Sequence, residues 1–342
     1  MSINIERRSA LKSLAATPLL LGSAALAGCA DRGSTTPSGT LNIGQISNSV
    51  AFFPLFIAEQ QGYFTDEGIK VGKRPRLGTG AKVAAALKSG SIDIGAGVIT
   101  DFFNLAGVED GARLVSSLVT EYYVDIVVPP SFEGAADDAG IDEKITALVG
   151  KKIGITGPGS GTEALVNYLF GSIGRNAATD STMVNLGSAA TSAIGALSAD
   201  RVDALAFFQP IGQQAEASGN GKIFISPVRG DIPSLRGALH GVVFSSKELL
   251  ERKAEEVGGF QRAMQRALND IHGDRAHVRK LLGRYLKETD PAALDALIPI
   301  LRKEVPPKPA IRRSSYTTAS KFHLSSGLVD ETPKYESVRF TQ

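Results

Sequence analysis

Short apolar runs alternate with longer segments of helical period from Leu41 onward. The segments 53–61 and 82–88 repeat apolar residues at spacings of three and four, which is typical of a helix that buries one face. The intervening runs have strand length and are rich in Ile, Leu and Val; they are 41–46, 69–71, 92–96 and 114–118. This alternation predicts an α/β fold with largely parallel sheets covered by helices.

The chain also contains an internal repeat of domain length. Residues 86–94 and 196–204 share a pattern in which a helix ends in Ala-Leu and a short turn leads into an apolar-Asp-apolar strand. The two copies are 110 positions apart, and the same offset places the Ile-Gly pair 43–44 on the Ile-Gly pair 153–154. A shared offset of this length indicates two lobes built on one plan, not a solenoid of short repeats.

The loops after the predicted strands carry the candidate binding chemistry of both lobes. In open α/β sheets these loops form the crevice, because helix N-termini bring unpaired amide donors together there. The set of loops in each lobe mixes Gly with hydroxyl or amide residues and aromatics, which suits a pocket with an apolar wall and a few oriented donors. The loops are 47–53, 77–81 and 97–100 in the first lobe, and 156–162, 186–189 and 207–210 in the second.

The first 28 residues have the pattern of an export signal. A charged segment, 6–12, precedes an uncharged stretch, 13–27, that is too short to span a bilayer comfortably. The segment 26–29, Leu-Ala-Gly-Cys, resembles the bacterial lipobox, so Cys29 is the predicted lipidation site. The paired arginines also resemble a twin-arginine signal, and the export route stays open. A diacylated Cys29 would anchor the mature chain to the outer face of the cytoplasmic membrane or keep it in the periplasm.

Charge and cysteine content exclude several classes of protein. The whole chain has 37 Lys and Arg against 35 Asp and Glu, and the predicted signal takes away three basic residues and one acid. The mature chain is then formally neutral, which argues against nucleic-acid binding. Cys29 is the only cysteine, which excludes an internal disulfide, a Cys-X-X-Cys redox pair and a zinc site made of thiolates. Residues 29–40 are small and polar, and we expect them to form a flexible tether.

The start of the first lobe resembles the signature of a known family. Residues 54–69, PLFIAEQQGYFTDEGI, resemble the "P…VA…GYF..EG" signature of the periplasmic binding proteins for nitrate, sulfonates, taurine and thiamine-pyrimidine precursors. The segments 87–95, 148–154 and 202–210 match later landmarks of that family in the same order. The resemblance extends from about residue 41 to about residue 286.

This resemblance implies an architecture. It predicts an α/β fold of the two-lobed periplasmic-binding-protein clamshell type, with mixed, mainly parallel sheets and two hinge crossovers near 122–127 and 232–242. The family's C-terminal helices, here within 247–305, are expected to pack onto lobe one. The predicted segments are a signal at 1–28, a tether at 29–40, lobe one at 41–123 plus 237–342, and lobe two at 124–236.

The resemblance also implies a function. It predicts an extracytoplasmic solute-binding lipoprotein of an ABC importer, which captures a small anionic organic solute of the sulfonate or carboxylate type between its lobes. Its partners would be the permease and the ATPase of that importer, and we expect a monomer without a cofactor. Three alternatives stay open: a binder of a thiamine-precursor pyrimidine, a pyrimidine-synthase-like enzyme, and a ligand-loaded sensor protein.

The loop 157–162 is the clearest candidate for holding an anion. Ser160, Gly161 and Thr162 precede a helical pattern, so their amides and hydroxyls could bind an anion at a helix N-terminus. The alternative is an ordinary helix cap, in which Ser160 accepts a backbone hydrogen bond. The loop lacks the Gly-Lys-Ser/Thr ending of a P-loop, which argues against nucleotide binding.

The remaining candidates for ligand contact lie in the predicted loops and crossovers. Aromatic residues there would form apolar walls, and amide or hydroxyl side chains would orient the ligand. For the phenylalanines the alternative is a place in the core, and for Asn48 and Thr79 it is helix capping. These candidates are Asn48, Phe52, Phe53, Thr79, Gly80, Thr100, Tyr122, Tyr123, Phe207, Gln209 and His240.

The sequence offers little support for catalysis or metal binding. The four histidines form no metal-spaced pair such as His-Glu-X-X-His, so no metal site is predicted. There is no Gly-X-Ser-X-Gly elbow, and lipidation would consume the only thiol. We therefore expect a binding protein without catalytic residues.

Overall fold

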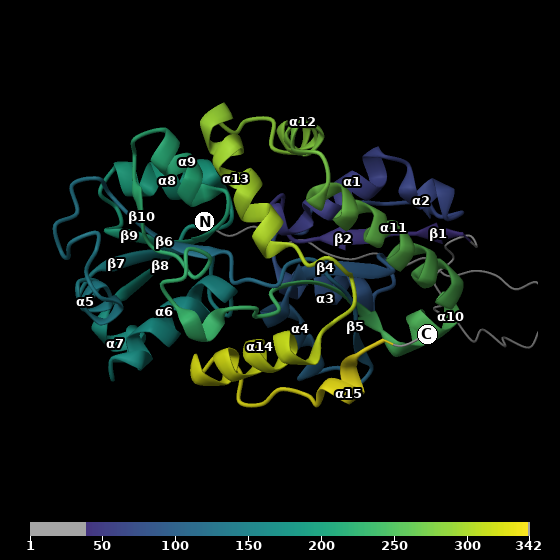
Figure 1. The fold of residues 1–342 in the computed structure, drawn as a ribbon. Helices are drawn as coiled ribbons and strands as arrows, with labels where there is room; N and C mark the ends of the chain where they lie inside the picture. The colour runs from purple at the N-terminus through teal and green to yellow at the C-terminus, as the bar shows by residue number, and fades with distance from the viewer. Residues whose placement is uncertain (1–38, 341–342) are drawn as a thin grey trace, which may run out of the picture. The chain divides into compact units, whose positions relative to one another are not determined.

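Two large β-sheets and one small strand pair organise residues 39–340, the part of the chain that the computed structural model describes (Figure 1). The predicted signal at 1–28, the lipidation site Cys29 and most of the predicted tether lie outside the described residues. Within residues 39–340, none of the helices combines the length and the hydrophobicity needed to cross a lipid bilayer.

The four-stranded sheet has the spatial order β2-β4-β11-β5. Strands β2 and β4 are parallel, whereas β11 is antiparallel to both of its neighbours. All five residues of β4 are buried, as expected of a strand covered on both faces. The strands are β2 (Ile43–Gln45), β4 (Ile94–Val98), β5 (Ala112–Ser117) and β11 (Gly241–Ser246). A small parallel pair, β1 (Thr40–Leu41) and β3 (Lys70–Val71), lies apart from it.

The five-stranded sheet has the order β10-β6-β9-β7-β8. Strand β7 is parallel to β8 and β9, whereas β6 is antiparallel to β9 and β10. Both large sheets are therefore mixed, and the predicted α/β class with mixed sheets is confirmed. Parallel pairing does not predominate as expected, because the strand that follows each crossing pairs antiparallel with both of its neighbours. The strands are β6 (Val124–Val128), β7 (Lys152–Ile155), β8 (Thr182–Asn185), β9 (Ala204–Phe208) and β10 (Lys222–Ile225).

The chain passes twice between the two sheets. Residues 118–123 lead from β5 into β6, and residues 226–240 lead from β10 back into β11. The predicted crossover at 122–127 is placed slightly late, because Val124 to Val127 are already paired with β9. In each sheet, the strand after a crossing is the one that is antiparallel to its neighbours. The predicted residue limits of the two lobes stay a prediction.

The 110-residue repeat corresponds to one structural unit that occurs in each sheet. The Asp93 carboxylate accepts a hydrogen bond from the backbone N–H of Asn42 at 2.7 Å, and Asp203 accepts from Lys152 at the same distance. Each aspartate tethers the start of one parallel strand to the turn before the next. The aspartates of the sequence pattern are therefore structural, because they fix the register of β2 against β4 and of β7 against β9.

Helices cover the four-stranded sheet and build its core. Helix α11 packs against α1 and α2, and Phe64 stacks on Phe260 with ring centroids 5.6 Å apart. Both rings are buried, and each contributes about 1.5 to 3 kcal/mol through burial. The helices are η1 (Val50–Phe52), α1 (Phe53–Gln60), α2 (Tyr63–Asp66), α3 (Gly80–Lys88), α4 (Ile99–Ala106), α10 (Lys247–Arg252), α11 (Ala254–His272) and α12 (Arg275–Tyr285).

A second set of helices belongs to the stretch of chain between the crossings. Helix α6 packs against β6 and β9, and α9 packs against β6, β9 and β10. These helices are α5 (Ile141–Thr146), α6 (Gly161–Ser172), α7 (Ala177–Asp180), α8 (Ala190–Ser198) and α9 (Ile211–Ala217). The short helix η2 (Pro233–Leu235) lies in the second crossing itself.

The last helices contact elements around both sheets, not lobe one alone as the resemblance implied. Helix α13 (Pro291–Glu304) packs against α12 and also against α9, and α14 (Arg313–Ser325) packs against α6. The reason is the distribution of aromatic side chains on α14. Tyr316 meets Phe103 from α4, whereas Phe322 lies 4.9 Å from the Tyr168 ring of α6. Helix α15 (Tyr335–Val338) then packs against β5.

Candidate ligand-binding site

A cavity of about 210 Å³ lies where loops from both sheets meet. Four pairs of lining residues are 110 positions apart, so the repeat contributes equivalent positions from each side: 46 and 156, 47 and 157, 78 and 188, 98 and 208. The lining loops follow the strands, as the sheet argument predicts. The lining residues are Ile46, Ser47, Gly78, Thr79, Gly80, Ala81, Val98, Asp101, Asn104, Tyr123, Val124, Thr156, Gly157, Pro158, Gly159, Ser160, Gly161, Thr162, Ser188, Phe208 and His240.

Half of the predicted ligand-contact residues line this cavity. They come from the start of α3, the first crossing, the start of α6 and the residue before β11. They are Thr79, Gly80, Tyr123, Ser160, Gly161, Thr162 and His240. Whether they touch a ligand stays a prediction.

The other predicted residues lie behind the cavity or beside it. Phe52, Phe53 and Phe207 are fully buried in the hydrophobic core. Thr100, Tyr122 and Gln209 are also buried, and Asn48 lines a neighbouring cavity. These seven residues are not part of the cavity lining, so any contact of theirs with a ligand stays a prediction.

The start of α6 is a closed hydrogen-bond network. The Ser160 hydroxyl accepts from the Glu163 backbone N–H at 3.4 Å, and the Glu163 carboxylate accepts from the Gly159 N–H at 2.6 Å. The Thr162 hydroxyl lies 2.8 Å from the Ser160 hydroxyl and 3.0 Å from both the backbone nitrogen and the hydroxyl of Thr156. Ser160 is therefore the N-cap of α6, which is the alternative to an anion site that the sequence left open.

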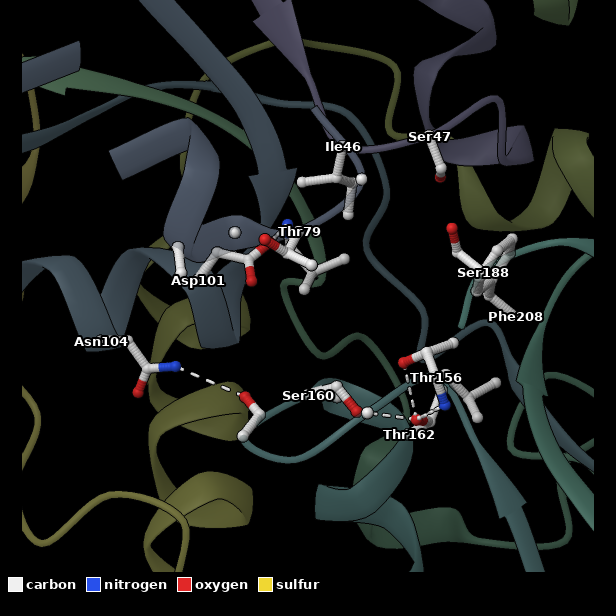
Figure 2. A pocket seen from close by; sticks show the side chains of 18 of the residues that line it. Ile46, Ser47, Thr79, Asp101, Asn104, Thr156, Ser160, Thr162, Ser188 and Phe208 are labelled. Atoms are coloured by element: carbon white, nitrogen blue, oxygen red, sulfur yellow. Dashed lines mark hydrogen bonds between the residues drawn. The ribbon is translucent and has the colours of Figure 1, made fainter. Parts of the chain in front are cut away.

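Helix α4 contributes two polar side chains to the opposite wall of the cavity. Figure 2 shows Asp101 and Asn104 on this wall, facing the loop that carries Thr156, Ser160 and Thr162. The Asp101 carboxylate accepts from the Val98 backbone N–H at 2.9 Å, and the Asn104 amide donates to the Gly159 carbonyl at 3.4 Å. Burial raises the pKa of Asp101 to about 6.

A cluster of three aromatic rings lies beside the cavity, and two of them, Tyr123 and His240, line it. The His240 ring lies 4.1 Å from the Tyr122 ring and 4.7 Å from the Tyr123 ring, measured between centroids. The Tyr122 hydroxyl donates to the Gly161 carbonyl at 2.5 Å, and the Tyr123 hydroxyl lies 3.3 Å from the Ser49 hydroxyl. Burial holds the pKa of His240 well below its usual value, so His240 is neutral near pH 7.

A match to a family model covers most of the folded chain. The model, described as NMT1/THI5 like, matches residues 49–276. The chain belongs to the NMT1/THI5-like family. Among curated protein sequences, none matches this chain significantly.

Solved structures similar to this NMT1/THI5-like chain have the fold of periplasmic solute-binding proteins. The alkanesulfonate-binding protein SsuA from Xanthomonas axonopodis pv. citri, bound to MOPS, matches with TM-score 0.69 and 21% identity over 89% of this chain and 100% of that chain. The aliphatic sulphonate-binding SsuA from Escherichia coli matches with TM-score 0.65 and 16% identity over 84% and 91% of the two chains. The nitrate-binding NrtA from Synechocystis PCC 6803 matches with TM-score 0.58 and 14% identity over 72% and 66%. The predicted family and the predicted periplasmic-binding-protein fold are confirmed.

Sequence reasoning missed several lining residues of this NMT1/THI5-like chain. Asp101 and Asn104 lie one helical turn apart in α4, just beyond the predicted binding loop 97–100. The signal that could have found them is the first turn of the helix after β4, where an acid at the third position points back toward the loop. Ser188 and Phe208, by contrast, lie within loops that the sheet argument had already selected.

A second cavity of about 560 Å³ adjoins the first and shares Ser47, Ser188 and Phe208 with it. Its lining includes Asn48, which accepts a hydrogen bond from Arg76 at 2.6 Å, and further charged residues near the end of α12. Among the described residues of this NMT1/THI5-like chain, no group of three or more His, Cys, Asp or Glu side chains is placed to hold a metal ion.

Proposed function

We propose that this chain is the solute-binding component of an ABC importer and captures a small organic solute in the cavity between its two sheets. The observation that carries the proposal is the lining itself. Equivalent loops of two repeated units, joined by two crossings, enclose one cavity with hydroxyl, amide and aromatic groups. Several of the similar solved structures are named as binding proteins for sulfonates or nitrate, which supports the same class of function.

Solute capture would occur by a hinge motion of the two lobes at the crossings. In the described structure, Asn104 reaches across the cavity to Gly159, and Tyr122 in the first crossing contacts Gly161. Contacts of this kind would close over a bound solute and exclude water from it. The closed form would then be the one that the permease recognises.

The proposal includes export and anchoring. Cys29 would carry the lipid, and the permease and the ATPase of the importer would be the partners of a monomeric chain. Changing Cys29→Ser should release the protein from the membrane fraction without altering solute binding. A serine variant that stays with the membrane would contradict the anchor.

The described contacts favour binding over catalysis. The one close hydroxyl–histidine contact involves Thr100 and His323, 2.7 Å apart, and both side chains are buried outside the cavity lining. Among residues 39–340, no lysine lines the cavity, whereas the pyrimidine-synthase-like alternative would use a lysine there to hold a pyridoxal cofactor. A sensor role would use the same cavity, and the presence of importer genes beside this one would favour import.

A thermal-shift screen tests the proposal. Sulfonates, carboxylates, amines and pyrimidines would be added to the purified chain, because a solute that binds only the folded state raises the melting temperature. We expect a concentration-dependent rise with at least one of these classes. A chain that is folded but gives no shift with any class would contradict the proposed function.

A further inference from the structure

The cavity carries a negative charge and no positive one. Asp101 is the only side chain with a formal charge near neutral pH among the described lining residues, and no Lys or Arg lines the cavity within residues 39–340. His240 is neutral there for the reason given above. A purely anionic solute would therefore find no countercharge in the lining and would approach a carboxylate.

The position of the Asp101 carboxylate is fixed by the fold. One oxygen, Oδ2, accepts from the Val98 N–H at 2.9 Å. The other oxygen, Oδ1, lies so close to Gly80 that a Cβ atom there would be 1.9 Å from it, which explains the glycine at the start of α3. The carboxylate is thus held against the wall of the cavity by α3 and α4 together (Figure 2).

The facing wall does not compensate for this charge. The Thr162 hydroxyl already contacts Thr156 and Ser160, and the Glu163 carboxylate occupies the amide of Gly159. A second carboxylate therefore lies at the helix N-terminus where the sequence had suggested an anion site. The contacts give the predicted anionic solute no support.

Asp101 has no equivalent carboxylate in the second repeated unit. The position 110 residues later is Ile211, which is buried and apolar. The structural aspartates Asp93 and Asp203, by contrast, occur in both units and make equivalent hydrogen bonds. Among the described residues that line the cavity, the carboxylate of Asp101 therefore has no counterpart on the side of the second unit, so the lining is electrically asymmetric.

We propose that Asp101 determines specificity by accepting hydrogen bonds from an N–H group of the solute, so that the cavity selects amines, amidines or amino-substituted rings over purely anionic molecules. This inference rests on the proposed function, because it concerns the solute of the same cavity. The carboxylate, still largely ionised at neutral pH, supplies both the acceptor and the countercharge for such a group. Desolvation inside the cavity makes the preference for a donor stronger than it would be in water.

The competing role for Asp101 is that of a helix cap alone. An asparagine separates the two roles, because its side-chain oxygen can still accept from Val98 while its charge is gone. Asp290→Asn is the matched control, since Asp290 caps α13 by accepting from the Ala292 N–H at 2.7 Å and does not line the cavity.

The test uses two probe sets of matched shape, benzamidine and 2-aminopyrimidine against benzoate and pyrimidine-2-carboxylate. Each is titrated by calorimetry into the wild-type chain, Asp101→Asn and Asp290→Asn. We expect the wild type and Asp290→Asn to bind a member of the first set and to bind its carboxylate counterpart at least about tenfold more weakly. Asp101→Asn should lose about tenfold or more in affinity for the first set. Its preference for the first set over the carboxylates should become smaller or reverse.

The outcomes separate the inference from the proposed function. Preferential binding of the carboxylates by the wild type, or unchanged affinities in Asp101→Asn, would overturn the role of Asp101 and leave a solute-binding protein. A folded chain that binds no member of either set, and none of the broader thermal-shift panel, would contradict the proposed function and the inference together.

Discussion

The carboxyl group of Asp125 is buried, and its burial disfavours the ionised form. Asp125 lies in strand β6, and Ser226 is the first residue of the second crossing. The Asp125 oxygens accept hydrogen bonds from the Ser226 hydroxyl at 2.5 Å and from the Gln213 amide at 3.3 Å. Burial nevertheless raises the pKa of Asp125 to about 6. Burial also raises the pKa of Glu304 well above its usual value, and Asp125 raises it further.

The raised pKa of Asp125 predicts that the stability of the folded chain depends on pH. Because the pKa of Asp125 is higher in the folded chain than in the unfolded chain, the free energy of unfolding falls as pH rises from about 4 to about 6. Asp125→Asn should remove that part of the fall and raise stability at pH 7 by roughly 1 to 3 kcal/mol. Urea unfolding of both chains from pH 4 to pH 8 measures this. A variant that is less stable than wild type at pH 7 would show that the charge is favourable.

Thr162 gives a second prediction at the scale of one side chain. Thr162→Val removes a hydroxyl that contacts Ser160 and both the backbone and the side chain of Thr156. We expect a loss of about 1 to 3 kcal/mol in stability, because the Thr156 N–H loses its acceptor, with little change in affinity for the solute. Thr65→Val, at an exposed position on α2, is the control and should change neither. Reduced affinity at unchanged stability would restore the anion site that the sequence predicted.

Among the elements, α14 joins two parts of the core. Phe322 is buried against Tyr122 and Tyr168, whereas Leu324, two residues further along the same helix, is 43% exposed. Phe322→Ala should destabilise the chain by about 3 to 5 kcal/mol, because it leaves a cavity in a packed interior. Leu324→Ala should stay within about 0.5 kcal/mol of wild type. Equal effects of the two changes in thermal melts would mean that α14 does not stabilise the core.

The elements were largely predictable because local patterns determine them. The predicted helix 53–61 is α1, and the predicted strands at 92–96 and 114–118 are β4 and β5 with ends shifted by one or two residues. Helix α13 likewise begins with a local signal, because Asp290 is its N-cap and Pro291 its first residue. The contacts of α13 and α14 with α9 and α6 were not predictable, since long-range packing of aromatic side chains leaves no periodic signal.

The residues of the candidate site were also predictable only where a local sequence pattern locates them. Strand-end loops could be located, so Thr79, Tyr123 and Ser160 were found in the lining. The phenylalanines at 52, 53 and 207 lie in the same loops, and only burial shows that they point into the core. Asp101 was missed because the predicted binding loop ended at residue 100, one residue before the first-turn acid of α4.

For the whole molecule, two repeated units meet at one cavity, and the central claim is that this cavity holds the solute. Ser188 contributes a lining position from the second unit and is half-buried, so Ser188→Phe should fill the cavity without disturbing either core. Ser198→Phe, exposed at the end of α8, is the matched control for adding the same ring.

Calorimetric titration of the strongest probe from the solute screen into these two variants and the wild type is the most direct test. The account predicts one binding site per chain in the wild type and in Ser198→Phe, and no measurable binding in a folded Ser188→Phe. Undiminished binding by Ser188→Phe would place the solute elsewhere and contradict the account.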